Sequence, residues 1–191
     1  VVLIHGLWNS GEIFNLFIKK LDDKNIEYFA PTLKHDFGKI SIIEITKSLN
    51  KLIIEKYGYE KKIDIIGFSM GGLIARNWIY RFEGYKRTEK FISIGSPHFG
   101  TLTAQLVPSF LLKGISEMKI SSRFLIDLSK FDYLLENVEC ISFFTNWDLM
   151  VFPGWKAYLP RGNSYSLRIF KHKDLIRDER AIEVIFKELI N

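Results

Sequence analysis

The sequence is poor in cysteine and has no long apolar run, and each absence excludes a class of protein. Its 191 residues include a single cysteine, Cys140, so an internal disulfide and a cysteine-based metal site are excluded. Cys140 begins the apolar run 140–144, where we expect a buried and unreactive thiol. No apolar segment reaches the roughly 20 residues that a membrane-spanning helix needs.

A recognisable signal peptide is also missing from the start of the sequence. Val1 already belongs to an apolar run that predicts a strand, so a leader could have been removed ahead of it. The sequence therefore leaves two locations for the protein: the cytoplasm, which we favour, and the outside of the cell after secretion.

Neither sign of charge is in large excess. The chain has 27 Lys and Arg against 22 Asp and Glu, which gives a net charge of +5 and a pI of about 9.2. The basic residues are scattered over predicted helix ends and polar faces, and no arginine stripe is interleaved with stacking aromatics. We therefore expect no nucleic-acid partner. A solvated surface accounts for the basic residues, and weak attraction to anionic lipid is the alternative.

The hydrophobic content of 47% excludes disorder and indicates a packed domain. Apolar runs predict six strands, at 1–4, 26–30, 63–66, 91–94, 138–145 and 165–170. Helical spacing of apolar residues predicts helices at 12–24, at 41–57, from the motif below to about residue 82, near 103–113 and 121–129, and at 176–190. Strands that alternate with helices predict one α/β domain over 1–191, a three-layer sandwich with a mostly parallel sheet covered on both faces.

The stretch 63–75 carries the strongest chemical signal. It consists of a short apolar strand, then Gly67-Phe68-Ser69-Met70-Gly71, then a helix. This is the layout of a nucleophile elbow, in which a serine on a sharp strand-to-helix turn exposes its hydroxyl at the edge of a sheet. A side chain at Gly67 or Gly71 would collide with the neighbouring backbone in so tight a turn.

A serine needs a base to accept its proton, and the base needs a carboxylate to orient it. Catalytic groups in α/β sheets gather at the carboxyl ends of strands. Ser69, Asp148 and His172 each follow a predicted strand, so we expect them to form the nucleophile, acid and base.

The rival candidates are placed less well for catalysis. We expect His5 and His98 to brace loops and His35 to be solvated. The rival acids are two residues of the irregular segment and one that lies too close to His172 in sequence: Asp127, Asp132 and Asp174.

Four segments of the chain resemble the lipases and esterases of the α/β-hydrolase superfamily. Residues 1–7 resemble the first strand and oxyanion loop of small bacterial lipases, and 67–72 resemble their elbow. Residues 95–101 resemble their Thr-Pro-His-x-Gly-Thr segment, and 148–153 resemble their acid-bearing turn. Because its first strand resembles what is usually the third strand of the superfamily, the chain resembles the minimal six-stranded lipases. It departs from their pattern at two positions: Phe68 replaces the commoner histidine, and Phe152 interrupts Val-Pro.

This resemblance implies a carboxylic-ester hydrolase that acts on acyl-lipid or acyl-glycerol substrates through an acyl-serine intermediate. The backbone N–H groups of Leu7 and Met70 would form the oxyanion hole. Neither a metal nor an organic cofactor is expected, and the protein is expected to be a monomer with transient contact to lipid. The alternatives are an acyl-protein or acyl-CoA thioesterase, and a catalytically silent binding module.

Two further features concern the substrate. The 37 residues of segment 101–137 exceed what one crossover needs, so we expect part of it to form a small cap over Ser69. Aromatic residues cluster in the loops near Leu7 and Asp148, where they predict an acyl-binding wall or a lipid-contacting rim. The expected substrate-binding residues are Trp8, Phe68, Trp147 and Phe152, with Trp155 nearby.

Overall fold

A computed structural model, which describes residues 1–108 and 110–191, shows a sheet of five strands that all run parallel. The strands follow one another across the sheet in chain order. They are β1 (Val2–Ile4), β2 (Ile63–Phe68), β3 (Thr88–Ile94), β4 (Glu139–Phe144) and β5 (Asn163–Ser166). The predicted α/β class with a parallel sheet is confirmed, with one strand fewer than expected.

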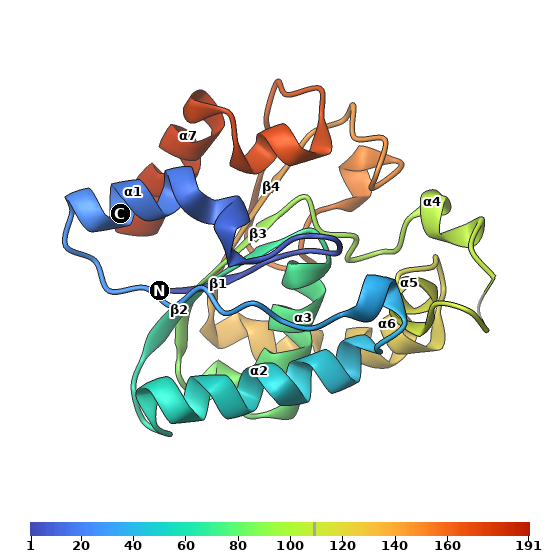
Figure 1. Cartoon of the computed structure of the whole chain (residues 1–191), viewed down its shortest axis with the longest axis horizontal. Coiled ribbons are helices and arrows are strands. Elements are labelled where there is room, and N and C mark those ends of the chain that lie inside the picture. The colour runs from blue at the N-terminus through green and yellow to red at the C-terminus, as the bar shows by residue number, and fades with distance from the viewer. Residues whose placement is uncertain (109) are drawn as a thin grey trace.

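Helices cover both faces of the sheet (Figure 1). One face carries α1 (Asn15–Asp23) and α7 (Glu179–Ile190), and the other carries α2 (Ile42–Tyr57) and α3 (Met70–Arg81). Three short helices lie between β3 and β4 at one end of the sheet: α4 (Leu102–Gln105), α5 (Lys113–Glu117) and α6 (Arg123–Ser129).

Strands β2 to β4 are buried along most of their length because helices pack on both sides of them. Their side chains divide between two apolar clusters, one on each face of the sheet. Burial on both faces explains why these strands read as continuous apolar runs rather than as alternating ones.

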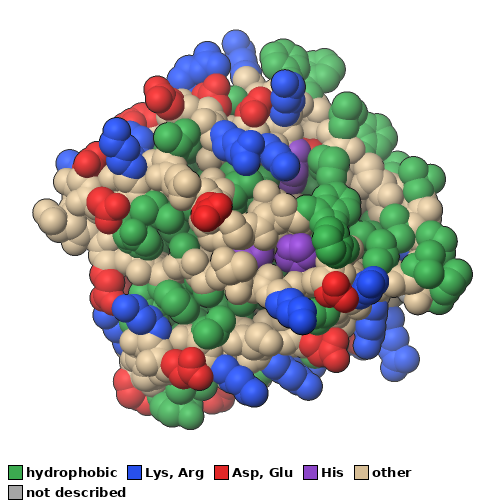
Figure 2. Space-filling model, viewed as in Figure 1, with side chains coloured by type: hydrophobic (Ala, Val, Ile, Leu, Met, Phe, Trp, Pro, Cys, Tyr) green, Lys and Arg blue, Asp and Glu red, His purple; other side chains and the backbone are tan. Residues whose placement is uncertain are grey.

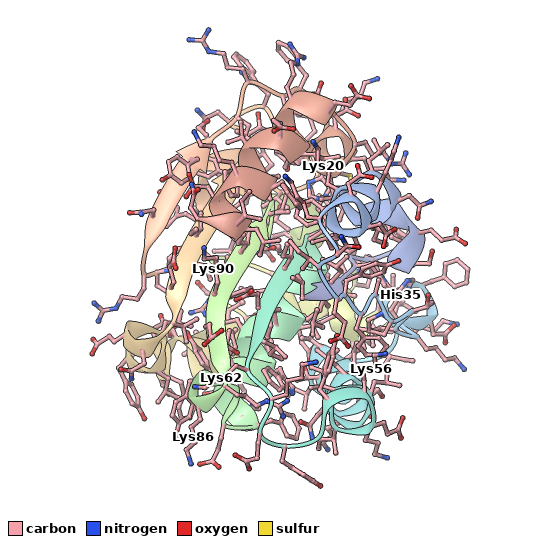
Figure 3. The ribbon with its side chains drawn as sticks, turned by 90° about the vertical axis from the view of Figure 1, so that its left-hand side faces the viewer. Lys20, His35, Lys56, Lys62, Lys86 and Lys90 are labelled. Atoms are coloured by element: carbon pink, nitrogen blue, oxygen red, sulfur yellow. The ribbon has the colours of Figure 1, made fainter. Side chains whose placement is uncertain are left out.

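Local signals in the sequence explain several helix ends. The predicted capping box of α2 is present: the Ser41 hydroxyl accepts the backbone N–H of Glu44 at 3.2 Å, and the Glu44 carboxylate accepts the N–H of Ser41 at 3.3 Å. At the last turn of α7, the nearly buried Lys90 ammonium donates to the carbonyl of Glu188 at 2.7 Å (Figure 3). A cation there complements the negative end of the helix dipole.

The predicted strand 26–30 is wrong, because only Phe29 pairs with the sheet. Its N–H donates to the carbonyl of Val1 at 2.8 Å and its carbonyl accepts from Leu3 at 2.9 Å. Pro31 follows almost at once and has no N–H with which to continue the ladder. The last strand is also shifted, to 163–166 instead of 165–170, because the chain turns where Ile169 N–H donates to the carbonyl of Leu167.

The predicted helix near 103–113 is replaced by two short helices, α4 and α5, with Pro108 between them. Proline has no N–H to donate and ends a helical ladder. The helix predicted over 12–24 begins as a 3-10 turn at Gly11–Phe14, and the one predicted over 176–190 begins at Glu179, where the Asp178 carboxylate caps it.

Cys140 is buried, as expected, and burial raises the pKa of its thiol to about 12. Among the described residues, no helix is long and apolar enough to cross a membrane. The same part of the chain holds no group of three or more His, Cys, Asp or Glu side chains that could bind a metal ion.

Parallel strands place their carboxyl ends at one edge of the sheet. Gly67 pairs with Ser93, Ile94 with Phe143, and the next position of β4 with Ser166. The loops that follow β1 to β4 therefore meet at this edge.

Candidate active site

Ser69 occupies the turn between β2 and α3 in a backbone conformation that non-glycine residues rarely adopt, with φ 55° and ψ −127°. Its N–H donates to the carbonyl of Ile94 at 2.8 Å, which fixes the turn against β3. A Cβ at Gly67 would lie 2.5 Å from Gly72 Cα, and one at Gly71 would lie 2.0 Å from the carbonyl oxygen of Ile4. The glycines are thus required because the backbones approach closely. The unusual backbone conformation of Ser69 costs about 1–3 kcal/mol, which the surrounding packing must offset.

Asp148 and His172 form a buried pair at the same edge of the sheet. His172 Nδ1 lies 2.6 Å from Asp148 Oδ2, and the aspartate is almost fully buried. The other carboxylate oxygen accepts the backbone N–H groups of Met150 at 2.8 Å and Val151 at 2.9 Å. This network fixes the carboxylate, which in turn orients the imidazole.

The second nitrogen of His172, Nε2, is buried and has no hydrogen-bond partner. His172 and Ser69 both line a cavity of about 170 Å³. An imidazole that is held at Nδ1 and free at Nε2 can take a proton from a group in that cavity.

The loop after β1 lies directly against Ser69. A Cβ at Gly6 would lie 2.7 Å from Ser69 Cβ and 3.2 Å from its hydroxyl oxygen. The next residue, Leu7, lines the cavity, and Met70 is the first residue of α3. The first N–H groups of a helix have no partner within the helix, so both predicted oxyanion residues stand beside the serine.

The other histidines have structural surroundings. His5 Nε2 accepts the N–H of Leu33 at 2.8 Å while Nδ1 lies 2.9 Å from the carbonyl of Gly6, which braces the loop after β1. His98 Nε2 lies 2.7 Å from the Ser93 hydroxyl, and burial holds its pKa well below 6.5. His35, expected in solvent, is half-buried with its ring edge against His5 at 6.0 Å.

Two of the three rival acids are paired elsewhere, and none of the three is the carboxylate that lies against His172 Nδ1. Asp132 accepts from Arg76 and, at 2.7 Å, from the Tyr80 hydroxyl. Asp127 pairs with Lys130 at 2.7 Å. Asp174 lies in the 3-10 turn that His172 begins, where its carbonyl accepts the backbone N–H groups of residues 177 and 178.

The predicted substrate-binding residues are separated by the structure. Trp8 lines the cavity, whereas Trp147 and Phe152 are exposed outside its lining. The prediction that Phe68 binds substrate is wrong, because its side chain is fully buried and is not among the residues that line the cavity; it stacks on the His172 ring with centroids 4.9 Å apart. Because β2 is buried on both faces, its sequence does not alternate between apolar and polar residues, so the direction of the Phe68 side chain could not be read from it.

The segment 101–137 contributes much of the cavity wall. Its lining side chains are mainly apolar and come from α4, α5 and their flanks: Thr101, Thr103, Ala104, Val107, Ile115 and Met118. Hydrogen bonds from Thr103 to the carbonyl of Met150 and from Leu102 to the carbonyl of Phe152 join this segment to the acid-bearing loop.

Thr145, which was not among the residues predicted from the sequence, links the loop that contains Asp148 to the segment that precedes His172. Its fully buried hydroxyl donates to the carbonyl of Ile169 and accepts the N–H of Trp147 at 3.3 Å. Its place at the end of β4, three residues before Asp148, was the available signal.

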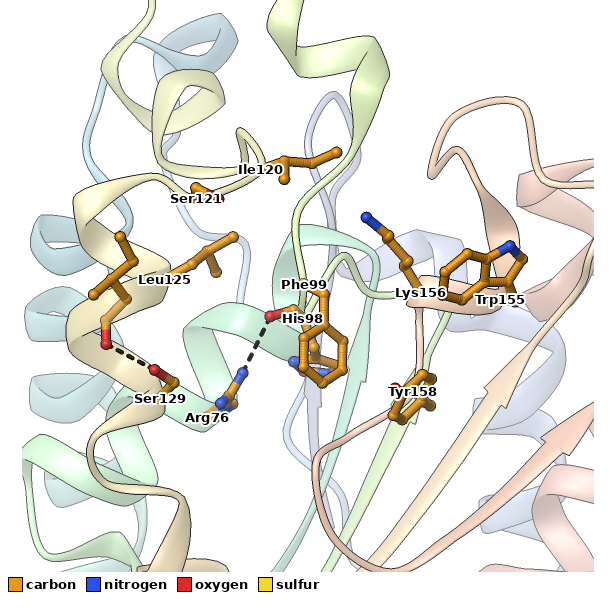
Figure 4. A pocket seen from close by; sticks show the side chains of 11 residues that line it. Arg76, His98, Phe99, Ile120, Ser121, Leu125, Ser129, Trp155, Lys156 and Tyr158 are labelled. Atoms are coloured by element: carbon orange, nitrogen blue, oxygen red, sulfur yellow. Dashed lines mark hydrogen bonds between the residues drawn. The ribbon is translucent and has the colours of Figure 1, made fainter.

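A second cavity, of about 430 Å³, lies on the other side of the loop 97–101 (Figure 4). The buried Arg76 at its floor is engaged by Tyr80 at 3.1 Å, by the carbonyl of His98 at 3.4 Å, and by Asp132. Its lining contains no serine with a histidine base beside it, because His98 already bonds Ser93. Ser69 and His172 line the smaller cavity and not this one.

Several solved structures share this fold. The chain is similar to the mature lipase BlEst2 of Bacillus licheniformis, with a TM-score of 0.77 and 16% identity over 98% of this chain and 90% of that one. It is similar to lipase B of Aspergillus fumigatus, with a TM-score of 0.77 and 15% identity over 100% of this chain and 52% of that one. A monoacylglycerol lipase of Paleococcus ferrophilus gives a TM-score of 0.70 and 15% identity over 99% and 93%.

At such identities the likeness shows the fold, which is that of the α/β-hydrolases. No curated protein matches the chain in sequence. The sequence model of one family, described as palmitoyl protein thioesterase, matches residues 1–145. The family and the fold together support a hydrolase of lipid-type esters in the broad sense. The chain belongs to the palmitoyl protein thioesterase family, within the α/β-hydrolase superfamily.

Proposed function

We propose that the chain is a serine hydrolase that cleaves acyl esters through an acyl intermediate on Ser69. The observation that carries the proposal is the contact of His172 Nδ1 with Asp148 Oδ2 at 2.6 Å. The other ring nitrogen of His172, Nε2, has no partner, and His172 lines the same cavity as Ser69. A nucleophile, a base and an orienting acid in chain order Ser, Asp, His are the components of an α/β-hydrolase site.

In the acylation step, Ser69 Oγ attacks the acyl carbonyl carbon while its proton passes to His172 Nε2. The charge that develops on the carbonyl oxygen is stabilised by the N–H groups of Leu7 and Met70, which is worth about 3–4 kcal/mol per donor in related chemistry. When the tetrahedral intermediate collapses, the carbon–oxygen bond to the alcohol breaks and the alcohol leaves with the proton from Nε2.

In the deacylation step, water takes the place of the alcohol. His172 Nε2 accepts a proton from the water as its oxygen bonds to the acyl carbon, and then returns that proton to Ser69 Oγ as the acid departs. Asp148 stays ionised throughout and stabilises the imidazolium form of His172.

The cavity wall favours an acyl group. Apolar side chains such as Val107, Ile115 and Val151 line it beside Ser69. Its volume of about 170 Å³ lies below the ~300–1,000 Å³ of sites that enclose a drug-sized ligand. A short acyl chain is therefore enclosed, and a longer one extends onto the exposed apolar side chains around the mouth.

A thioesterase is the second candidate, and the family match favours it. The same residues cleave a thioester by the same sequence of steps, with a thiol in place of the alcohol as leaving group. Thiols are better leaving groups, so proton donation by His172 matters less for that substrate.

Turnover of nitrophenyl esters of increasing chain length, beside acyl-coenzyme A and an S-palmitoylated peptide, tests the proposal and separates the two candidates. We expect ester hydrolysis that falls at least about 10³-fold in Ser69→Ala and in His172→Ala. A preference for thioesters in kcat/KM assigns the second candidate. If neither substrate class is hydrolysed by the folded protein, the chain is a silent binding module and the proposal is wrong.

A further inference from the structure

The mouth of the catalytic cavity is surrounded by exposed apolar side chains. We call six of them the apolar rim: Trp8, Leu106, Trp147, Leu149, Met150 and Phe170. Each is between 49% and 86% exposed. Figure 2 shows hydrophobic side chains gathered on the right of the molecule, where Figure 1 places α4 and the loops after β4.

The rim is one connected surface although its residues come from four segments. The rings of Trp147 and Phe170 lie 6.1 Å apart. Trp8 and Met150 line the same cavity, and the backbone carbonyl of Met150 accepts a hydrogen bond from the hydroxyl of Thr103 in α4, the helix that Leu106 follows. A contiguous apolar patch of this kind marks an interaction site in a folded protein.

Basic residues predominate in the segments that supply most of the rim. The two segments that carry four of its six residues, 97–116 and 149–173, contain no Asp or Glu. They contain six basic residues, Lys113, Lys156, Arg161, Arg168, Lys171 and Lys173, of which Arg161 is paired with Glu136 at 2.9 Å. Since the whole chain has a net charge of +5, the remainder has one more acidic than basic residue. The net positive charge of the chain therefore comes from these two segments.

We propose that this face docks on anionic lipid bilayers, with the apolar rim in the headgroup layer and the basic residues against the lipid phosphates and carboxylates. Exposed Trp and Phe side chains partition into the interfacial layer, and Lys and Arg near an anionic leaflet add electrostatic attraction. The cavity mouth then faces the membrane, so acyl substrates reach Ser69 from the bilayer. This assignment deepens the proposed function by naming where its substrate resides.

Binding to vesicles tests the assignment without turnover. The Ser69→Ala protein is sedimented with vesicles of phosphatidylcholine alone and with vesicles that contain phosphatidylcholine and phosphatidylserine in a ratio of about 7 to 3. We expect at least about tenfold stronger partition onto the anionic vesicles at 0.1 M salt, and loss of this preference at 1 M salt, where the Debye length falls to about 3 Å. Because binding is measured on an inactive variant, its result is independent of ester hydrolysis. The protein can hydrolyse esters without binding vesicles, which would contradict the docking proposal alone, or bind vesicles without hydrolysing esters, which would contradict the proposed function alone.

Two sets of variants locate the binding face. Lys156→Gln, Arg168→Gln and Lys171→Gln together are expected to reduce anionic binding about tenfold or more. The matched control is Lys24→Gln, Lys51→Gln and Lys56→Gln, which removes the same charge from the end of α1 and from α2 and should leave binding unchanged. Lys56 lies on the side of the molecule shown in Figure 3. Leu106→Ser with Phe170→Ser should weaken binding to both vesicle types, whereas Tyr59→Ser with Ile190→Ser should not.

Three results would overturn the proposal. They are equal partition onto neutral and anionic vesicles, equal losses in the rim and control variants, and a dimer in sedimentation equilibrium that Leu106→Ser with Phe170→Ser dissociates. The last result would assign the rim to a second copy of the chain.

Discussion

The phenyl ring of Phe68 stacks on the imidazole of His172, with centroids 4.9 Å apart and planes inclined by 30°. Phe68 is fully buried at the end of β2, one residue before Ser69. The strand that leads to Ser69 therefore also contacts the ring of His172. This contact fixes the plane of the imidazole, while Asp148 fixes its rotation through Nδ1.

Phe68→Leu should lower kcat about tenfold with little change in KM, because the ring support of His172 is lost while a hydrophobic side chain still fills the site. Leucine keeps most of the buried volume, so the fold should persist; Phe68→Ala would cost about 3–5 kcal/mol. Steady-state kinetics on a soluble nitrophenyl ester measure the effect. Unchanged kcat in Phe68→Leu would mean that the stack contributes only to packing.

Gly6→Ala should abolish most of the activity. The new Cβ would lie 2.7 Å from Ser69 Cβ, so the loop that carries Leu7 must move away from the serine. A displacement of about 1 Å at a reacting group can cost on the order of 10²-fold in rate. Comparison of kcat with the free energy of unfolding checks this prediction, and a loss of stability with full kcat would count against an oxyanion role for this loop.

Thr145→Val should lower kcat more than stability, since it removes the hydroxyl that joins the carbonyl of Ile169 to the N–H of Trp147. Valine keeps the shape of the side chain but leaves both backbone groups unsatisfied, at about 1–3 kcal/mol for a buried group. Thr145→Ser retains the hydroxyl and should restore kcat. If the serine variant were as slow as the valine variant, the threonine methyl and not the hydrogen bonds would matter.

Stability should fall as the pH is lowered below neutral, because burial holds the pKa of His98 well below 6.5 and lowers that of His5 as well. A group with a depressed pKa in the folded state takes up protons on unfolding at acidic pH. His98 alone then removes about 1.4 kcal/mol per pH unit below 6.5, until its folded pKa is reached. Urea unfolding at pH 7.5 and 5.5 measures this loss, and His98→Asn should reduce it; an equal loss in both proteins would exclude His98 as its source.

The sequence predicted those features that depend on local backbone geometry or on the position of a residue at the end of a strand. The capping box of α2 and the crowding at Gly67 and Gly71 follow from local geometry, and both are present. The pairing of Asp148 with His172 was expected because parallel strands deliver their carboxyl ends to one edge.

Features that depend on three-dimensional neighbours could not be predicted. The apolar run 26–30 has strand character, yet a single residue of it finds a partner in the sheet before Pro31. Phe68 lies in a strand buried on both faces, so no alternation reveals its direction. Thr145 is one of six threonines, and although its place at a strand end was visible, its hydrogen bond depends on where the chain returns 24 residues later.

A fluorophosphonate probe reacts only with an activated serine and needs no knowledge of the substrate, so its labelling of the protein measures whether Ser69 is a nucleophile. We expect one adduct per chain by intact mass, located on the peptide that contains Ser69. We expect no adduct in Ser69→Ala and at least about 10²-fold slower labelling in His172→Ala. No adduct on the folded protein, or labelling of His172→Ala at the rate of the unchanged protein, would contradict the proposed roles of Ser69 and His172.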